Sequence, residues 1–208
     1  IIGPVFNKSN LLLNKLPEVT FLSFTNKLGN NYPNIISTGV NAISQLNAIK
    51  KFIKETNLER TMFLIPDSDF KLEIENAIKK TNIKFKDKFI YNTDPTLLTA
   101  QIEKITRYEV RKQNLIDEID RIENSDDPKK KTKIENLMKL DTIGGINFDS
   151  VVIADFDESL KSVATSLLYT DISSKRIKYI TLNQWFDKSL IKERSLQPIY
   201  FPSVDKKN

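Results

Sequence analysis

The sequence predicts an α/β fold in which a parallel sheet is flanked by helices, and two observations support this prediction. First, short apolar runs recur along the chain, and the central one, Phe148–Asp157, holds three consecutive β-branched residues after a Gly-Gly break. A run of this length between turn signals is typical of a strand buried on both faces. Second, helical patterns separate this run from three others, which is the alternation of a doubly wound domain. The other three runs are Thr61–Ile65, Lys84–Ile90 and Ile177–Thr181.

The first forty residues carry shorter strand signals than the rest of the chain. Ile1–Val5 is expected to be a strand end that Gly3-Pro4 turns, Val19–Phe24 a second strand, and Ile35–Gly39 a brief extended segment. The chain is therefore expected to divide into a small N-terminal portion, residues 1–40, and a larger sheet domain, residues 41–204. Residues 205–208 are polar and are expected to form a tail.

Two helix starts can be predicted closely. From Asn41 to about Thr56, apolar residues recur at three- and four-residue spacing, which indicates an amphipathic helix with one face against the core. Further on, Thr93 or Asp94 is suited to cap a helix whose first position is Pro95, because proline is tolerated where no backbone donor is needed.

The segment between the second and third strong strands is too long for an ordinary crossover helix. Apolar residues keep one face from Leu97 to Ile122, which predicts a continuous helix of some 25 residues. A charged turn, Asn124–Lys131, follows, and a second helix runs to the Gly144-Gly145 break. We expect a crossover helix extended into a protruding helical hairpin over about 97–143. Its charged face either remains solvated while the hairpin packs on itself, or docks a partner.

Composition excludes several classes of function. The chain has no cysteine and no histidine, so thiolate chemistry, the usual catalytic triads and most transition-metal sites are excluded, which argues against an enzyme. The net charge of +5 comes from basic residues interspersed with acidic ones, so no nucleic-acid partner is expected.

No Gly-rich phosphate loop or other cofactor motif is present, because Gly144-Gly145 precedes a strand instead of opening a helix. No apolar run approaches the length of a membrane span, so any membrane attachment would need a lipid anchor outside this chain.

Acidic residues follow two of the predicted strands, Asp67 with Asp69 and Asp155 with Asp157. In an open α/β sheet the carboxyl ends of the strands form the ligand crevice. Three roles remain open for these carboxylates: capping or turning the chain, receiving a ligand amine, and holding Mg²⁺.

Further candidates are uncharged. One predicted strand ends in Ser23, Thr25 and Asn26, and another is followed by Asn7. Hydroxyl and amide groups at the ends of strands are suited to bind a carboxylate or a similar anion. Trp185, the only tryptophan, follows the last strong strand and either stacks on a ligand or a partner, or packs on its own core.

In this order, these segments resemble the type I periplasmic binding proteins. Ile-Ile-Gly-Pro followed by Val-Thr-Phe-Leu-Ser-Phe-Thr-Asn is similar to the middle of that family's first lobe, and Ile35–Gly39 resembles the crossing to its second lobe. Thr106–Lys112, Leu167–Asp171 and Leu182–Asp187 are similar to the penicillin-binding protein activator branch of the fold.

The resemblance implies a partial first lobe in residues 1–40 and a nearly complete second lobe beyond it, with the first strands of lobe one and the final return segments absent. In the activator branch it implies a non-catalytic envelope protein that activates peptidoglycan synthases by contact, located in the periplasm or held at the outer membrane as a lipoprotein. Phe6 and Lys8 favour this branch, because solute receptors prefer small polar residues there.

Two other functions remain open beside that of an envelope activator. One is a solute-binding receptor of an ABC transporter for an amino acid or amide, and the other is an Asp-dependent Mg²⁺ enzyme on a Rossmann-like sheet. The residues expected to line the cleft between the lobes are Asn7, Ser23, Thr25, Asn26, Asp67, Asp155 and Trp185.

Overall fold

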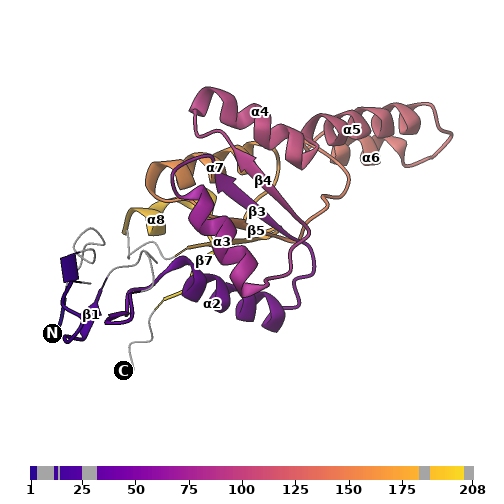
Figure 1. The fold of residues 1–208 in the computed structure, drawn as a ribbon. Coiled ribbons are helices and arrows are strands. Elements are labelled where there is room, and N and C mark those ends of the chain that lie inside the picture. The colour runs from indigo at the N-terminus through magenta and orange to yellow at the C-terminus, as the bar shows by residue number, and fades with distance from the viewer. Residues whose placement is uncertain (4–11, 14, 25–31, 183–187, 204–208) are drawn as a thin grey trace.

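A five-stranded parallel sheet forms the centre of the molecule (Figure 1). The computed structural model describes residues 1–3, 12–13, 15–24, 32–182 and 188–203. The strand order is β4-β3-β5-β6-β7, and every neighbouring pair is parallel. The α/β prediction is confirmed. The strands are β3 (Thr61–Pro66), β4 (Asp87–Tyr91), β5 (Ser150–Ile153), β6 (Lys178–Thr181) and β7 (Ile199–Tyr200).

The strands β3 and β5 are buried on both faces, as their continuous apolar runs predict. Two predicted boundaries are wrong by a few residues. The run Lys84–Ile90 becomes a strand only from Asp87, and the run Phe148–Asp157 contributes only Ser150–Ile153 to the ladder. Apolar residues flanking a strand can pack into the core without pairing, so hydrophobicity does not mark where the ladder begins and ends.

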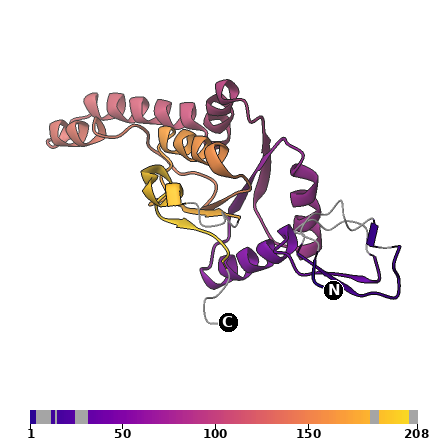
Figure 2. The same ribbon diagram turned by 90° about the vertical axis from the view of Figure 1, so that its left-hand side faces the viewer.

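Helices cover both faces of this sheet (Figure 2). One face packs against α2 (Ala42–Glu55) and α3 (Lys71–Thr81). The other packs against α4 (Pro95–Thr106) and α7 (Asp157–Tyr169), with Leu190 from α8 (Lys188–Lys192) and Leu196 from the 3₁₀ helix η1 (Arg194–Leu196). Successive residues along each strand alternate between these two layers, which is the side-chain period of an extended chain.

The two predicted helix starts are confirmed. Asn41 caps α2 by accepting from the Ser44 amide at 3.0 Å, and the Ser44 hydroxyl accepts from the Asn41 amide at 3.1 Å. Asp94 caps α4 by accepting from the Thr96 amide at 2.9 Å, with Pro95 at the first position. Such caps satisfy backbone donors that the helix itself leaves unpaired.

The continuous helix predicted from Leu97 to Ile122 is wrong. The chain breaks at Arg107, whose φ of 53° is left-handed, so that α4 ends at Thr106 and α5 (Tyr108–Glu123) begins directly afterwards. A single left-handed residue interrupts the helix without interrupting the apolar pattern, and periodicity therefore cannot detect it. Together, α5 and α6 (Lys130–Leu137) form a helical hairpin, which is shorter than the expected 97–143 because α4 packs on the sheet. We call this hairpin the arm, and it projects away from the sheet (Figure 1).

The N-terminal residues form a separate, small parallel sheet. β1 (Phe21–Ser23) pairs with β2 (Ile35–Ser37), and Ile2 forms a bridge with Leu22 on the other side of β1. The predicted strand and extended segment are present but shorter than predicted, and residues 4 and 5 of the predicted strand end lie outside the described residues. The Asn34 amide group ties them to the preceding turn by donating to the carbonyl of Leu16 at 2.9 Å.

None of the helices in the described part of the chain is long and apolar enough to cross a membrane.

Candidate functional site

The candidate site lies where the strands β4, β3 and β5 end, at the carboxyl edge of the sheet. Tyr91 is the last residue of β4 and is in register with Pro66 of β3. On the other side of β3, Ile153 is in register with Leu64, so Asp155 reaches the level of Pro66 two residues later. Tyr91 and Asp155 are therefore placed on either side of the end of β3, on the face that α4 and α7 cover.

A hydrogen bond joins these two side chains across the end of β3. The Tyr91 hydroxyl donates to Oδ2 of Asp155, while Oδ1 of Asp155 accepts from the Phe156 amide at 2.8 Å. Tyr91 is fully buried and Asp155 is 9% exposed. Burial raises the pKa of the Tyr91 hydroxyl far above its ordinary value, and the neighbouring carboxylate of Asp155 raises it further. The phenol therefore stays protonated and remains a donor to Asp155.

Asp67 directly follows β3, the strand between β4 and β5, but its surroundings differ from those of Asp155. Its side chain is 62% exposed and pairs with Lys71 one helical turn further on, at 2.9 Å. Its backbone amide donates to the Tyr91 carbonyl at 2.8 Å, which continues the β3–β4 ladder by one bond. Exposed ion pairs of this kind contribute little to stability, so Asp67 remains available at the edge of the site.

Neither carboxylate caps a helix. Both α3 and α7 begin without a side-chain capping bond, so the capping interpretation of these two aspartates is not what the structure shows. Among the residues that the structure describes, no three acidic or metal-ligating side chains gather closely enough to hold a metal ion. The arrangement at Asp155 is instead a buried carboxylate supported by a phenol and a backbone amide.

Of the candidates in the N-terminal portion, the structure describes Ser23 alone. It ends β1 and is fully buried, and its carbonyl accepts from the Thr38 amide at 2.8 Å and from the Thr38 hydroxyl at 3.1 Å. Asn7, Thr25, Asn26 and Trp185 lie outside the described residues. The expectation that these residues line a cleft with Asp67 and Asp155 stays a prediction.

Tyr91 is the functional candidate that sequence reasoning missed. Its signal was present, since a hydroxyl-bearing aromatic follows directly after the predicted strand Lys84–Ile90. Its partner, however, lies 64 residues further along the chain and two strands away in the sheet. Only the strand order brings the two together.

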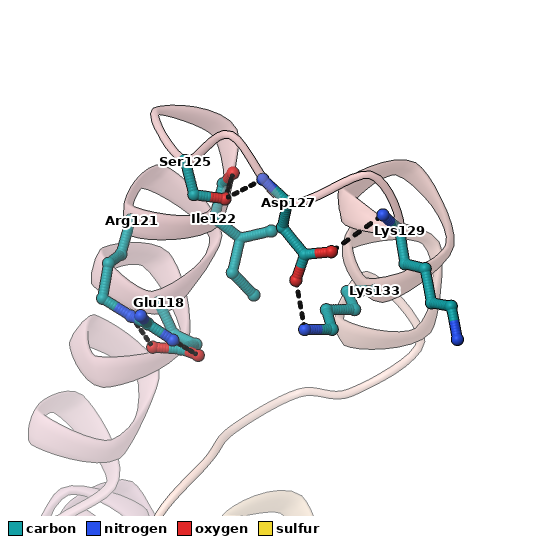
Figure 3. A network of polar contacts seen from close by, with 7 residues as sticks. All are labelled: Glu118, Arg121, Ile122, Ser125, Asp127, Lys129 and Lys133. Carbon is teal, nitrogen blue, oxygen red and sulfur yellow. Dashed lines mark hydrogen bonds and ion pairs between the residues drawn. The ribbon is translucent and has the colours of Figure 1, made fainter.

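The arm is a second candidate surface, on the other side of the molecule from this site. Because α4 runs back from the carboxyl edge, the arm leaves the sheet at the edge where the strands begin (Figure 1). At its tip, Asp127 accepts from the Lys129 amide at 2.8 Å and pairs with Lys133, as Figure 3 shows. These contacts lower the pKa of Asp127, with the bond from Lys133 as the main cause. None of the residues of α6 is buried.

Lysine is concentrated at the start of α6. The residues Lys129, Lys130 and Lys131 are exposed, and Lys130 reaches back to the carbonyl of Glu123 at the end of α5, at 3.3 Å. A cation at a helix C-terminus is favourable because the carbonyl groups there carry partial negative charge. The tip is thus internally bonded while it presents positive charge to solvent.

Comparisons with known proteins identify the fold. No family model matches the sequence, and no curated protein matches it. Among solved structures, an ABC transporter substrate-binding protein from Desulfitobacterium hafniense in complex with Leu aligns with a TM-score of 0.57 at 11% identity, over 100% of this chain and 52% of that one. Another structure with the same description and source gives 0.55 at 12% identity, over 88% and 46%.

An extracellular ligand-binding receptor from Verminephrobacter eiseniae aligns with a TM-score of 0.54 at 10% identity, over 99% of this chain and 53% of that one. The chain therefore spans about half the length of the structures that it matches. At this identity the likeness concerns the fold, which is the parallel α/β fold of the type I periplasmic binding proteins.

Proposed function

We propose that this chain belongs to a non-catalytic ligand-binding protein that receives a small amino-acid-like solute at the carboxyl edge of its sheet. The observation that supports the proposal is the buried Asp155–Tyr91 pair, which lies at the edge where open α/β sheets bind their ligands. The similar fold of a substrate-binding protein in complex with Leu agrees with this ligand class.

The chemistry of the pair suits an ammonium group. A carboxylate held at low exposure interacts strongly with a cation, because little water competes for it. The Tyr91 hydroxyl and the Phe156 amide orient the Asp155 carboxylate in advance, so the ligand need not order it. In this proposal Asp67, which is exposed at the end of β3, lies at the rim of the site. That Asn7, Thr25, Asn26 and Trp185 complete the site stays a prediction, and Ser23 is fully buried at the end of β1.

Calorimetry against a panel of free amino acids and their amides tests the proposal. We expect at least one member to bind, and Asp155→Asn to weaken its binding by tenfold or more, because truncating one partner of a buried charge pair is costly. Tyr91→Phe should weaken binding less, since it removes only the orienting donor. Asp87→Asn at the opposite edge of the sheet is the matched control and should leave affinity unchanged.

Two outcomes would contradict the proposal. One is a panel in which no compound gives heat or raises the melting temperature at millimolar concentration, because a ligand that binds only the folded state must stabilise it. The other is a bound amino acid whose affinity is the same for the wild type and for Asp155→Asn, which would remove this carboxylate from the site.

The arm supports a second candidate function, docking of a protein partner. A projecting helical hairpin with a basic tip is suited to contact a second protein. In the form that the sequence resemblance suggests, the partner is a peptidoglycan synthase and the protein is an envelope activator, located in the periplasm or anchored as a lipoprotein. The comparisons favour the ligand-binding proposal over this one, because they match substrate-binding proteins and a receptor.

Pull-down with a purified peptidoglycan synthase tests the docking function. Lys129→Glu with Lys131→Glu should abolish capture if the tip is the contact, whereas Lys79→Glu with Lys80→Glu on α3 should not. Capture that survives the tip variant, or that fails with the wild type, counts against this role.

A further inference from the structure

A pocket of about 580 Å³ lies in the layer that α2 and α3 form on one face of the sheet. Both helices end just before the strands that follow them, so the pocket is at the edge where β3 and β4 begin. Lys50 of α2 connects the two helix ends, because its ammonium group donates to the carbonyl of Thr81 at 2.8 Å. This location is remote from the carboxyl edge, and the pocket is therefore separate from the site described above.

The floor of the pocket is apolar. Ile53 and Ile83 are 8% and 4% exposed, and Leu58 is half-buried beside them. The end of α2 explains this placement, because Asn57 has a φ of 53° and the Leu58 amide donates to the Ile53 carbonyl at 3.0 Å. This left-handed ending brings the residue after the turn against the last helical turn.

The rim of the pocket is positively charged. Three lysines, Lys50, Lys54 and Lys84, line the pocket, with Glu59 as the one acidic lining residue. Lys50 is held by the Thr81 carbonyl, but no ion pair joins Lys54 or Lys84 to any residue in the described part of the chain. The residues lining the pocket include no aromatic ring on which a base or sugar could stack.

We propose that this pocket binds a single alkyl chain that carries an anionic head group, such as a fatty acid. The alkyl chain would cover the half-buried Leu58 and the small exposed parts of Ile53 and Ile83, and so remove apolar surface from water. The head group would lie between Lys54 and Lys84, where a charge-assisted hydrogen bond is available from each. The volume falls within the range of about 300–1,000 Å³ that is usual for small-molecule pockets.

The probe is sodium decanoate, titrated below its micelle concentration and followed by calorimetry. Two matched compounds, 1-decanol and decyltrimethylammonium, share its alkyl chain and differ in head-group charge. We expect decanoate to bind at least tenfold more tightly than either. Equal binding of decanoate and decanol would overturn the anionic part of the proposal, and no binding of decanoate would overturn the whole.

Charge reversal locates the site. Lys54→Glu with Lys84→Glu should weaken decanoate binding by tenfold or more, and Leu58→Asp should abolish it. Lys51→Glu is the control on the same helix, because Lys51 does not line the pocket. Melting temperatures near that of the wild type show that each variant is folded. Unchanged decanoate affinity in the folded Lys54/Lys84 variant would place the binding elsewhere and overturn the proposal.

Discussion

The sheet and the arm are stabilised in different ways, although both are parts of one chain. In β3 and β5 all ten residues are buried, between helices on both faces. In α6 no residue is buried, and the tip of the arm is held by hydrogen bonds and ion pairs over short sequence distances. Apolar burial makes the stability of the sheet a collective property, whereas the tip depends on exposed charges that contribute little individually.

Arg111 helps to attach the arm to the sheet layer, together with Tyr108 of α5, whose ring packs against that of Tyr169 in α7 with centroids 5.6 Å apart. Arg111 of α5 is 1% exposed, and its guanidinium donates to the Thr170 carbonyl at the end of α7. Among the described residues, Nε and Nη1 of Arg111 have no hydrogen-bond partner. Burial lowers the pKa of Arg111, and the charge of Asp171 opposes this effect. The base of the arm thus combines a favourable contact at a helix C-terminus with a costly buried charge.

The largest expected effect is in the sheet. Phe63→Ala removes a fully buried ring of β3 that packs edge-on against Phe85, with ring centroids 5.5 Å apart. We expect the free energy of unfolding to fall by about 3–5 kcal/mol, from the lost transfer energy and the cavity left behind. Urea denaturation measures this change. The control is Leu72→Ala on α3, which should change stability little because Leu72 is 70% exposed. If Phe63→Ala lowered the free energy of unfolding by less than about 1 kcal/mol, the sheet would not be closely packed.

The second effect is smaller and depends on alkaline pH. Tyr91→Phe should cost about 2 kcal/mol at neutral pH, because Asp155 loses a buried donor. In the unfolded chain Tyr91 has its ordinary pKa of 10.0, and the folded protein raises it, so the contribution of this group is present below pH 10.0 and is lost as pH rises above that value.

Melting temperatures between pH 8 and about 11 measure this dependence. The wild type should lose stability above pH 10 more steeply than Tyr91→Phe does. Tyr179 is also buried, with a raised pKa, so part of the dependence should remain in the variant. Tyr32→Phe, outside the five-stranded sheet, is the control. Parallel curves for the wild type and Tyr91→Phe would mean that this hydroxyl is not buried as the structure has it.

The third effect is at the base of the arm. Arg111→Ala removes the bond to the Thr170 carbonyl and leaves a void, but it also removes a buried charge, so we expect a net loss of only about 1–2 kcal/mol. Arg111→Met keeps an apolar stem and should be closer to the wild type. Hydrogen exchange should rise throughout α5 in the alanine variant and not in Lys112→Ala, whose side chain is exposed. No rise in α5 would show that Arg111 does not attach the arm.

The smallest effect is at the tip of the arm. Asp127→Ala removes the bonds to Lys129 and Lys133, and amides from 125 to 133 should exchange faster while the melting temperature stays unchanged. Because the folded state lowers the pKa of Asp127, its contribution is present above the ordinary value of 3.8 and is lost as pH falls below it. Acid should therefore loosen the wild-type tip and leave Asp127→Ala unaffected. Asp126→Ala is the neighbouring control, and global destabilisation by Asp127→Ala would contradict the local role.

Local sequence patterns predicted the strong strands of the main sheet, apart from two boundaries, and two helix starts. The apolar runs at Thr61–Ile65 and Val151–Ile153 are typical of strands buried on both faces, since half-exposed strands alternate. Asn41 and Asp94 cap their helices through residues two or three positions away. Such signals are local, so a sequence contains them in full.

The helix break in front of the arm and the contacts between distant strands and helices depend on how the chain packs. The break at Arg107 leaves the apolar period intact, and the Tyr91–Asp155 pair requires β3 to lie between two strands that are far apart in the sequence. The buried position of Arg111 likewise depends on where α7 ends. Contacts between distant residues follow from the strand order and from the packing of helices on the sheet, and no local pattern of residue types encodes them.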